Sequence, residues 1–323
     1  MKAPGTLLGR VMAWLLVMTA GLPAQAEQYP SKPVKVILQS AAGAGPDVHG
    51  RIIADRLGQA WKQQVLIINR VGAGGLLAAQ AAVSAEPDGY TLYYATIGGL
   101  VVLPAMQKLP FDLGRELVPI GLICDQPFVI AVAPSLGVNT LPELIALAKK
   151  RPGDLTYVGG SRGGMPHLTG ELFRTKAGID LTFIPYANVP QSLQEVMAGR
   201  IPVIVEGSGL SSAIESGSVK PLAVTSTKRL ANFPDVPTVA EFIPEFVVTA
   251  WFALMAPART PNNIVQQINR DLRAVLEQPE VQQRFQKLGA YVRPMSPVET
   301  AEFIRKEQQL WWPVVNQLNL TAQ

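Results

Sequence analysis

The sequence predicts an α/β protein made of two similar units. Apolar runs typical of strands alternate with amphipathic stretches typical of helices. The strands lead into short turns of glycine and other small residues, as strands do along the carboxyl edge of a parallel sheet. The chain has 323 residues. That length favours two domains, because one domain usually holds about 100–200 residues.

The first unit alternates strands and helices. Val34–Leu38 is an apolar run that predicts a buried strand, and the pattern up to Trp61 places apolar residues on one face of a helix. Val65–Ile68 and Tyr90–Ala95 are the next strands, with a helix over Leu76–Ser84 between them. Each of these strands leads into a turn that contains glycine. We therefore expect the turns to share the carboxyl edge of an open parallel sheet, where ligands bind.

A second unit repeats this alternation. Residues 118–132 read as strand material that crosses into it. Its turns are again small and polar, which predicts another βα arrangement with a similar edge. The expected strands span residues 155–158, 181–184, 201–206 and 221–225, and the expected helices span 141–150, 165–177 and 189–198.

The last part of the chain lacks glycine-rich turns and is expected to pack on the first unit. Residues 246–255 read as a strand, and amphipathic helices follow over 261–276 and 280–288. A long helix over 297–318 ends the chain, and Pro313 is expected to interrupt it.

The turn at residues 41–51 is the first candidate site. Ala41–Gly45 are small enough for a ligand to approach the backbone closely, and Pro46 fits the first turn of a helix. Asp47 adds a capping acceptor. The free N–H groups and the helix dipole predict a site for a small anion, although an ordinary turn without a ligand fits the same residues. Val48 stands where a dinucleotide fingerprint needs Gly or Ala, and no P-loop Gly-Lys-Ser/Thr tripeptide occurs.

A second candidate turn follows the strand at 155–158. Gly159–Gly163 match the G-x-S-x-G pattern of a hydrolase nucleophile elbow, which also needs an acid and then a late histidine. His49 precedes Ser161 and His167 follows it by six residues, so the order fails. We interpret the stretch as a second anion cradle, with Ser161 and glycine N–H groups as donors. Hydrolysis by Ser161 stays as the less favoured alternative.

Charged residues near these turns have two interpretations each. Arg162 is either solvated at the rim of a cleft or paired in fork geometry with a second ligand carboxylate. Glu206 ends a strand before a Gly-Ser-Gly turn. It can cap that turn, or it can accept a hydrogen bond from a ligand amine or hydroxyl.

Composition argues against several other kinds of site. Two histidines and one cysteine, far apart in the sequence, form no recognised metal-binding spacing. Cys124 lies in an apolar run and is expected to be a buried core thiol, without an intrachain disulfide. No basic cluster supports nucleic-acid binding.

Residues 1–26 have the pattern of an export signal. Lys2 and Arg10 give a positive start, and Val11–Leu22 is an apolar run too short to span a bilayer comfortably. Ala24–Ala26 is a small-x-small cleavage motif, so the mature chain is expected to begin at Glu27. An uncleaved anchor helix is the alternative. Removing the signal lowers the formal charge from +4 to +2, because it contains two cations and no acid.

Blocks along the whole mature chain resemble the Bug-type solute-binding proteins of tripartite tricarboxylate transporters. The blocks occur in order from end to end, which makes the match more specific than any single motif. They lie at residues 29–34, 42–47, 69–75, 87–92, 144–149, 167–173, 185–186, 222–226, 234–238, 251 and 256–261, and the terminal helix completes the set.

This resemblance implies a flytrap fold of the type II-like periplasmic-binding-protein class, with a ligand cleft between two α/β lobes joined by two crossings. The first lobe would comprise residues 27–125 and 227–323, and the second residues 126–226. The protein would be a periplasmic monomer that is not an enzyme, needs no cofactor and binds no nucleic acid. It would deliver a small carboxylate to membrane transporter subunits. A sensor that signals to a membrane partner is an alternative with the same closed state.

The resemblance also places the ligand contacts, which are held largely by backbone N–H groups and waters. The first lobe would contribute Ala42, Gly43, Ala44, Gly45 and Asp47, with Gly74 and Thr96 nearby. The second lobe would contribute Ser161, Gly163, Gly164, His167, Tyr186, Asn188 and Glu206. Arg162 is added to these candidates because of its own charge, and not because of the resemblance.

Several residues depart from the usual family pattern. Ala44 and Pro46 replace a glycine and a threonine, His49 replaces a small residue, and Arg162 lies in a stretch that is usually uncharged. Glu206 stands where Asp is common. We expect Arg162 and His49 to shift the preference towards a dianion or an aromatic acid.

Overall fold

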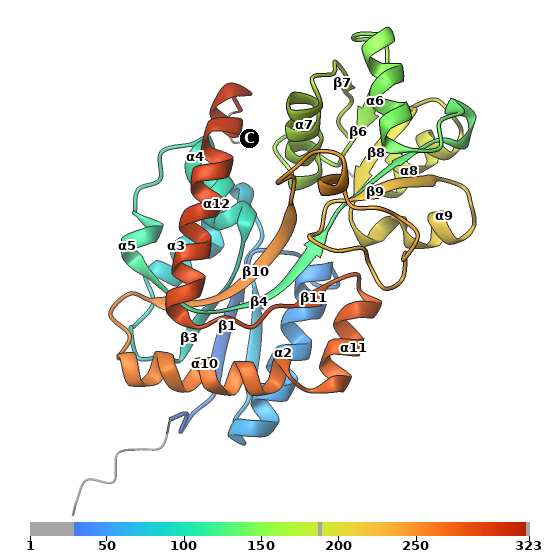
Figure 1. Ribbon diagram of the computed structural model, residues 1–323. Coiled ribbons are helices and arrows are strands. Elements are labelled where there is room, and N and C mark those ends of the chain that lie inside the picture. The colour runs from blue at the N-terminus through green and yellow to red at the C-terminus, as the bar shows by residue number, and fades with distance from the viewer. Residues whose placement is uncertain (1–28, 187–188, 321–323) are drawn as a thin grey trace, which may run out of the picture.

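The computed structural model describes residues 29–186 and 189–320, and they form two lobes, each built on its own sheet (Figure 1). The α/β, two-lobed fold class predicted from the sequence is confirmed. The expected export signal and Asn188 lie outside the described residues. Within the described ranges, no helix is long and apolar enough to cross a membrane.

The sheet of lobe 1 has six strands in the order β11-β4-β10-β3-β1-β2. Strand β1 (Val34–Leu38) pairs in parallel with β2 (Val65–Asn69) and β3 (Thr91–Thr96). The sheet is mixed rather than parallel throughout, because β10 (Thr249–Pro257) runs antiparallel to both β3 and β4 (Leu117–Pro127). The short β11 (Tyr291–Val292) pairs antiparallel with β4 at the edge.

Helices cover both faces of this sheet (Figure 1). One face packs against α2 (Gly45–Trp61), α10 (Asn262–Leu276) and α11 (Pro279–Lys287). The other face packs against α3 (Leu76–Val83) and α12 (Pro297–Gln317), as the alternation of strand side chains requires. The remaining short helices of this lobe are η1 (Ala73–Gly75), η2 (Gly98–Val102), α4 (Leu103–Met106) and α5 (Leu113–Glu116).

Helix α12 runs through Pro313 without the expected interruption. Proline removes one N–H, which leaves the carbonyl of Gln309 without its helical donor. Gln309 is exposed, so water can hydrate that carbonyl and the helix can continue.

The sheet of lobe 2 has five strands in the order β7-β6-β8-β5-β9. Its parallel part consists of β6 (Thr156–Val158) between β7 (Thr182–Phe183) and β8 (Val203–Glu206). The antiparallel part consists of β5 (Val129–Val132), which pairs with β8 and β9 (Lys220–Val224). The helices are η3 (Pro134–Leu136), α6 (Leu141–Lys150), α7 (Met165–Ala177), α8 (Val189–Met197), η4 (Ser208–Leu210), α9 (Ser211–Glu215) and η5 (Val239–Glu241).

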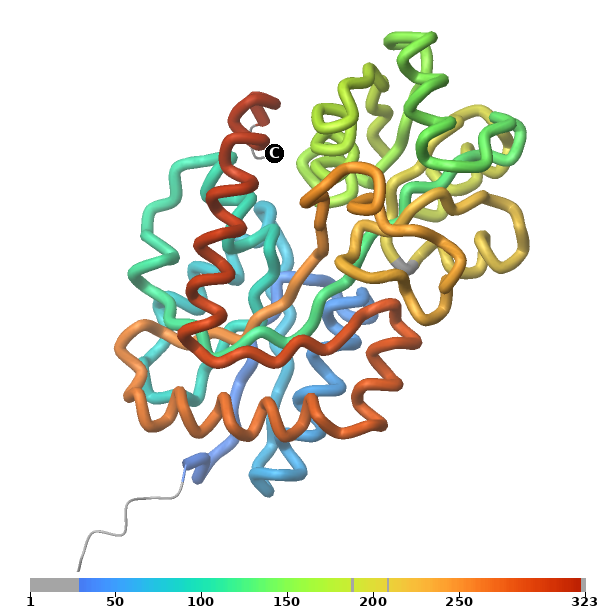
Figure 2. Tube along the Cα trace, viewed as in Figure 1, coloured from blue at the N-terminus to red at the C-terminus, as the bar shows by residue number. Residues whose placement is uncertain are grey.

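Two neighbouring segments connect the lobes, and Figure 2 shows them side by side. The buried Thr225 ties them together: its Oγ1 accepts from the Phe128 N–H at 2.8 Å and donates to the Val248 carbonyl at 2.5 Å. The loop after β9 packs on lobe 2, since the Val224 N–H donates to the Pro237 carbonyl at 2.9 Å. The loop after β9 thus contacts lobe 2 at Pro237, and the lobe boundary at residue 227 expected from the sequence stays a prediction.

Candidate ligand-binding cleft

The carboxyl ends of the parallel strands carry the glycine turns in both lobes. In lobe 1 these strands are β1, β2 and β3, and in lobe 2 they are β6 and β8. The lobes approach each other beside these turns. A Cβ added to Gly163 of lobe 2 would lie 3.1 Å from Cε of Met106, which ends α4 in lobe 1. Such carboxyl edges are where open α/β sheets bind ligands.

The first turn leads into α2 as the sequence predicts. Gly43 has a φ of 81°, which favours glycine, and Ala44 is the extended N-cap of the helix. Pro46 occupies the first turn and has no N–H. The N–H groups of Gly45 and Asp47 fall outside the helix's own hydrogen-bond ladder, as in any first turn. Ala42, Gly43 and Gly45 are exposed, so this turn is accessible to solvent.

The carboxylate of Asp47 supports this turn from below. It is 1 % exposed and accepts from the Gly43 N–H at 2.8 Å, from Asn69 Nδ2 at 2.8 Å and from both ends of the Arg51 fork at 2.9 and 3.0 Å. The Arg51 hydrogen bonds are the main reason that the pKa of Asp47 falls to about 2. Asp47 is thus ionised, and its oxygens already accept hydrogen bonds from the protein. Its role is to fix the shape of the turn.

Lobe 2 repeats this construction at the start of α7. Gly163 has a φ of 80°, Gly164 is the extended N-cap, and Pro166 occupies the first turn. The Gly163 N–H donates to Nδ1 of His167 at 3.1 Å, so an imidazole stands where lobe 1 has a carboxylate. In both lobes the N-cap residue also donates to a carbonyl three residues earlier, Ala41 or Ser161.

The ring of His167 is held neutral in this position. It is 2 % exposed and packs against Phe183, with ring centroids 3.9 Å apart. Burial lowers the pKa of His167 to about 4. Because Nδ1 accepts a hydrogen bond, the proton of the neutral ring lies on Nε2. The turn before α7 is therefore held by a neutral imidazole, whereas the turn before α2 is held by an ionised carboxylate whose charge is balanced by Arg51.

Ser161 and Arg162 lie exposed on the turn before α7. His167 uses its Nδ1 for the Gly163 N–H, and within residues 29–186 and 189–320 no hydrogen bond joins it to the Ser161 hydroxyl. The guanidinium of Arg162 lies 5.7 Å from the centre of the Phe183 ring. It forms no ion pair with any described carboxylate, so its charge is not balanced by a neighbour in this part of the chain.

Glu206 and Tyr186 border the same turn. The Tyr186 N–H donates to the Gly160 carbonyl at 3.2 Å, which joins the segment after β7 to the turn after β6. Glu206 ends β8 and is 9 % exposed; its Oε1 accepts from the Gly207 N–H at 2.9 Å. Burial raises the pKa of its carboxyl. A Cβ on Gly160 would lie 3.9 Å from Oε2, so this oxygen points towards the turn.

Lobe 1 contributes further small residues beside its first turn. Gly74 lies in η1 with a φ of 62°, and the hydroxyl of Thr96 accepts from the Gly99 N–H at 3.2 Å. Between them lies Gln39, whose Oε1 accepts from the Tyr93 hydroxyl at 2.8 Å and would be 2.3 Å from a Cβ on Gly99. Sequence reasoning missed Gln39. Its position directly after β1 was the available signal.

His49 does not contribute to the cleft. Its ring is fully buried, stacks on Phe285 with centroids 5.0 Å apart, and meets Phe252 edge-on at 5.5 Å. Helix α2 turns this side chain into the core of lobe 1, two positions after Asp47. Because its ring is buried in the core, any influence of His49 on ligand preference would be indirect.

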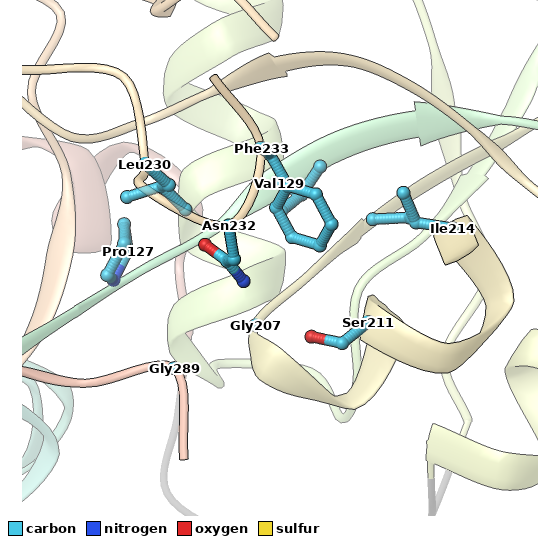
Figure 3. Close-up of a pocket in the computed structure, with 9 residues that line it drawn as sticks. All are labelled: Pro127, Val129, Gly207, Ser211, Ile214, Leu230, Asn232, Phe233 and Gly289. Carbon is cyan, nitrogen blue, oxygen red and sulfur yellow. The ribbon is translucent and has the colours of Figure 1, made fainter. Parts of the chain in front are cut away.

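A hollow lined by both lobes includes Gly207, the residue after β8 (Figure 3). Leu230, Asn232 and Phe233 come from the loop after β9, and Gly289 comes from lobe 1. The Tyr291 hydroxyl of β11 donates to Oδ1 of Asn232 at 3.2 Å. The shape of the hollow therefore depends on how the two lobes are positioned relative to each other.

Comparison with known proteins supports this description. The model of the family described as "Tripartite tricarboxylate transporter family receptor" matches residues 50–320. Protein BugT of Bordetella pertussis is 33 % identical over 309 residues, which cover 94 % of this chain and 95 % of BugT.

Two solved structures are also similar over their whole length. The structure of R. palustris Rpa4515 with adipate has a TM-score of 0.77 and 28 % identity, and covers 91 % of this chain and 100 % of that one. The periplasmic binding protein BugD has a TM-score of 0.74 and 28 % identity with the same coverage. The chain therefore belongs to the tripartite tricarboxylate transporter receptor family.

Proposed function

We propose that this protein is an exported solute-binding protein that captures a small organic carboxylate between its lobes for a tripartite tricarboxylate-type transporter. The observation that carries this proposal is the repeated cradle. Gly43 with Asp47, and Gly163 with His167, build the same turn at the carboxyl edge of each lobe. A similar protein has been solved with adipate, which is a carboxylate of the proposed class.

The cradles can hold a carboxylate by backbone donors. The free N–H groups of Gly45, Asp47, Met165 and His167 sit at helix N-termini, where the dipole favours an anion. Each terminus contributes about 0.3–1 kcal/mol. A single cradle is therefore weak, and useful affinity needs donors from both lobes. A ligand that engages the second cradle only in the closed state shifts the equilibrium towards closure.

Arg162 is the residue in this group best placed to set preference by charge. It lies at the rim without a described carboxylate partner, so a second ligand carboxylate can pair with it in fork geometry. The hydrophobic support below it, Phe183, can also accommodate an aromatic acid. We propose that Arg162 favours dianions or aromatic acids. If Arg162→Ala left the affinity for the best ligand unchanged, this role would be excluded.

The protein is proposed to act by binding alone. In the part of the chain that the structure describes, no hydrogen bond joins the Ser161 hydroxyl to His167, whose Nδ1 accepts from the Gly163 N–H. The sensor alternative uses the same cleft and the same closure, and a pull-down from membranes with the ligand-bound protein would identify its partner. We further propose cleavage after Ala26, release into the periplasm and action as a monomer.

A thermal-shift screen of residues 27–323 tests the proposed function. The panel contains dicarboxylates, tricarboxylates, amino acids, aromatic acids and neutral amides, and the protein is first freed of co-purified ligand. A ligand at about 100 times its dissociation constant stabilises by roughly 2.7 kcal/mol. This would raise the melting temperature by several degrees, since about 1 kcal/mol shifts a domain of this size by roughly 2–4 °C. No shift with any acid would overturn the proposal.

A further inference from the structure

Glu206 is a buried acid without a counter-charge. It is 9 % exposed, and its one hydrogen bond to described residues is the Gly207 N–H to Oε1 at 2.9 Å. No Lys, Arg or His in the described part of the chain forms an ion pair with it. The pKa of its carboxyl is raised by burial, and only the Gly207 N–H opposes this change. Buried carboxylates are normally paired, because removing a charge from water is costly.

The unpaired oxygen of Glu206 faces the second cradle. Strand β8 pairs in parallel with β6, so Glu206 lies beside the turn that begins at Gly159. Oε2 would be 3.9 Å from a Cβ on Gly160, whose carbonyl accepts from the Tyr186 N–H. Arg162 lies two residues further along the same turn. The same edge of lobe 2 thus carries a carboxylate and a guanidinium that form no ion pair with described residues, both near the start of α7.

A dicarboxylate without an amino group is not complementary to this pair of charges. The donors and Arg162 suit a ligand carboxylate, but Glu206 would repel a second negative charge placed near it. A ligand ammonium next to the carboxylate would instead give Glu206 its missing counter-charge. A hydroxyl would supply a hydrogen bond but would leave the buried charge uncompensated.

We infer that the ligand of this protein is a carboxylate that also has an amino group, and that Glu206 binds its ammonium. This inference rests on the proposed function and narrows its substrate class. The amino group is held at the end of β8, and the neighbouring carboxylate is held by the start of α7 and Arg162. Tyr186 and the Gly160 carbonyl border the position between them.

Matched ligand pairs test the inference by titration calorimetry with the mature chain. The pairs are succinate and L-aspartate, glutarate and L-glutamate, and adipate and L-α-aminoadipate; malate is the hydroxyl member of the first pair. We expect the amino member of at least one pair to bind about 10-fold or more tightly than its plain diacid, as a charge-assisted hydrogen bond would give. Glu206→Gln should reduce that preference to about 3-fold or less.

Asp154→Asn is the matched control. Asp154 lies just before β6, at the opposite end of that strand from the cleft, and is paired with Arg151 at the surface. The control removes one negative charge from lobe 2 and should keep the full preference. Melting temperatures of the ligand-free variants verify that both are folded. If Glu206→Gln does not fold, the ligand pairs titrated into the wild-type protein decide the inference.

The outcomes separate the two proposals. Equal or tighter binding of plain diacids in every pair would overturn the inference and keep the proposed function. Tighter binding of malate than of every amino member of the panel would also overturn it, because Glu206 would then serve a hydroxyl. An amino preference that survives Glu206→Gln would remove Glu206 from its role. Binding of no acid at all would overturn the proposed function, and the inference with it.

Discussion

Asp47 and His167 occupy equivalent positions in the two lobes, and each accepts a hydrogen bond from the N–H of a glycine four residues earlier. The distances are 2.8 Å from Gly43 and 3.1 Å from Gly163. In each lobe the acceptor is buried and the turn above it is at the sheet edge. The side chain fixes the turn from the protein side, which leaves the backbone donors of the helix start free for the proposed ligand.

The two acceptors differ in charge. Asp47 is ionised and its charge is balanced by Arg51, whereas burial keeps the His167 imidazole neutral. A neutral support in lobe 2 leaves the positive charge of Arg162 unbalanced by the cradle itself.

Gly43→Ala should weaken ligand binding on the order of tenfold, equivalent to about 1.4 kcal/mol. An alanine disfavours the φ of 81° at this position, so the turn above Asp47 must change shape. Gly137→Ala is the control, because Gly137 has a φ of 77°, also has no atom within 4 Å of an added Cβ, and lies outside the cleft after β5. Calorimetric titration of both variants checks this. Equal weakening by the two would show that the effect is not local to the cradle.

Asp47→Asn should lower the free energy of unfolding at neutral pH by about 2 kcal/mol, which is the value of the pKa change from 3.8 to about 2. Because the pKa of Asp47 is lowered by folding, its carboxylate stabilises the folded protein at every pH above the unfolded-state pKa of 3.8. That contribution is lost as the pH falls from about 4 towards 2. Urea denaturation at neutral and acid pH measures the difference. Asp55→Asn, an exposed change on the same helix, should cost less than about 0.5 kcal/mol.

The difference between wild type and Asp47→Asn should therefore shrink in acid. A constant difference down to the acid limit would mean that the ionised carboxylate is not the stabilising form.

His49→Phe should make the stability less sensitive to mild acid. Burial lowers the pKa of His49 to about 4, and neither ring nitrogen has a hydrogen-bond partner among the described residues. His49 binds a proton near pH 6.5 in the unfolded chain but only near pH 4 in the folded chain. The free energy of unfolding therefore falls as the pH drops from 6.5 towards 4. The loss approaches about 1.4 kcal/mol per pH unit for each such histidine.

His167 has the same lowered pKa and should retain its own share of the slope in the variant. Melting temperatures measured over this pH range report the change. A variant with the wild-type slope would show that His49 does not titrate as its burial requires.

Thr225→Val should destabilise the junction between the lobes. The change keeps the shape but leaves the Phe128 N–H and the Val248 carbonyl without their buried partner. We expect a loss of about 1–3 kcal/mol in the free energy of unfolding. Thr182→Val, which removes one exposed hydrogen bond to Gly153, should stay within about 0.5 kcal/mol. Equal effects of the two changes in denaturation curves would remove Thr225 from its junction role.

The sequence anticipated much of the fold because local signals determine it. Apolar periodicity located the strands and helices, and glycine with proline marked the turns that lie at the two sheet edges. The helix over Leu141–Lys150 was predicted with the bounds that the structure has. These features depend on residues close together in the chain.

Features that depend on distant partners were not predictable from the sequence alone. The antiparallel direction of β10 follows from its pairing with β3 and β4, far earlier in the chain. Asp47 looks like a ligand contact in sequence, yet Asn69, 22 positions away, helps to saturate it. His49 faces Phe285, which lies on a helix of the C-terminal region. Backbone donors carry no sequence signature, so the identity of the ligand is equally hidden.

Small-angle X-ray scattering of the mature chain, ligand-free and saturated with the acid that gives the largest thermal shift, tests the two-cradle mechanism most directly. A ligand held by both lobes should reduce the radius of gyration and sharpen the maximum of the pair-distance distribution, because closure brings the Gly43 and Gly163 turns together. Saturable binding with an unchanged radius of gyration would contradict the mechanism, since the acid would then be held by one lobe alone.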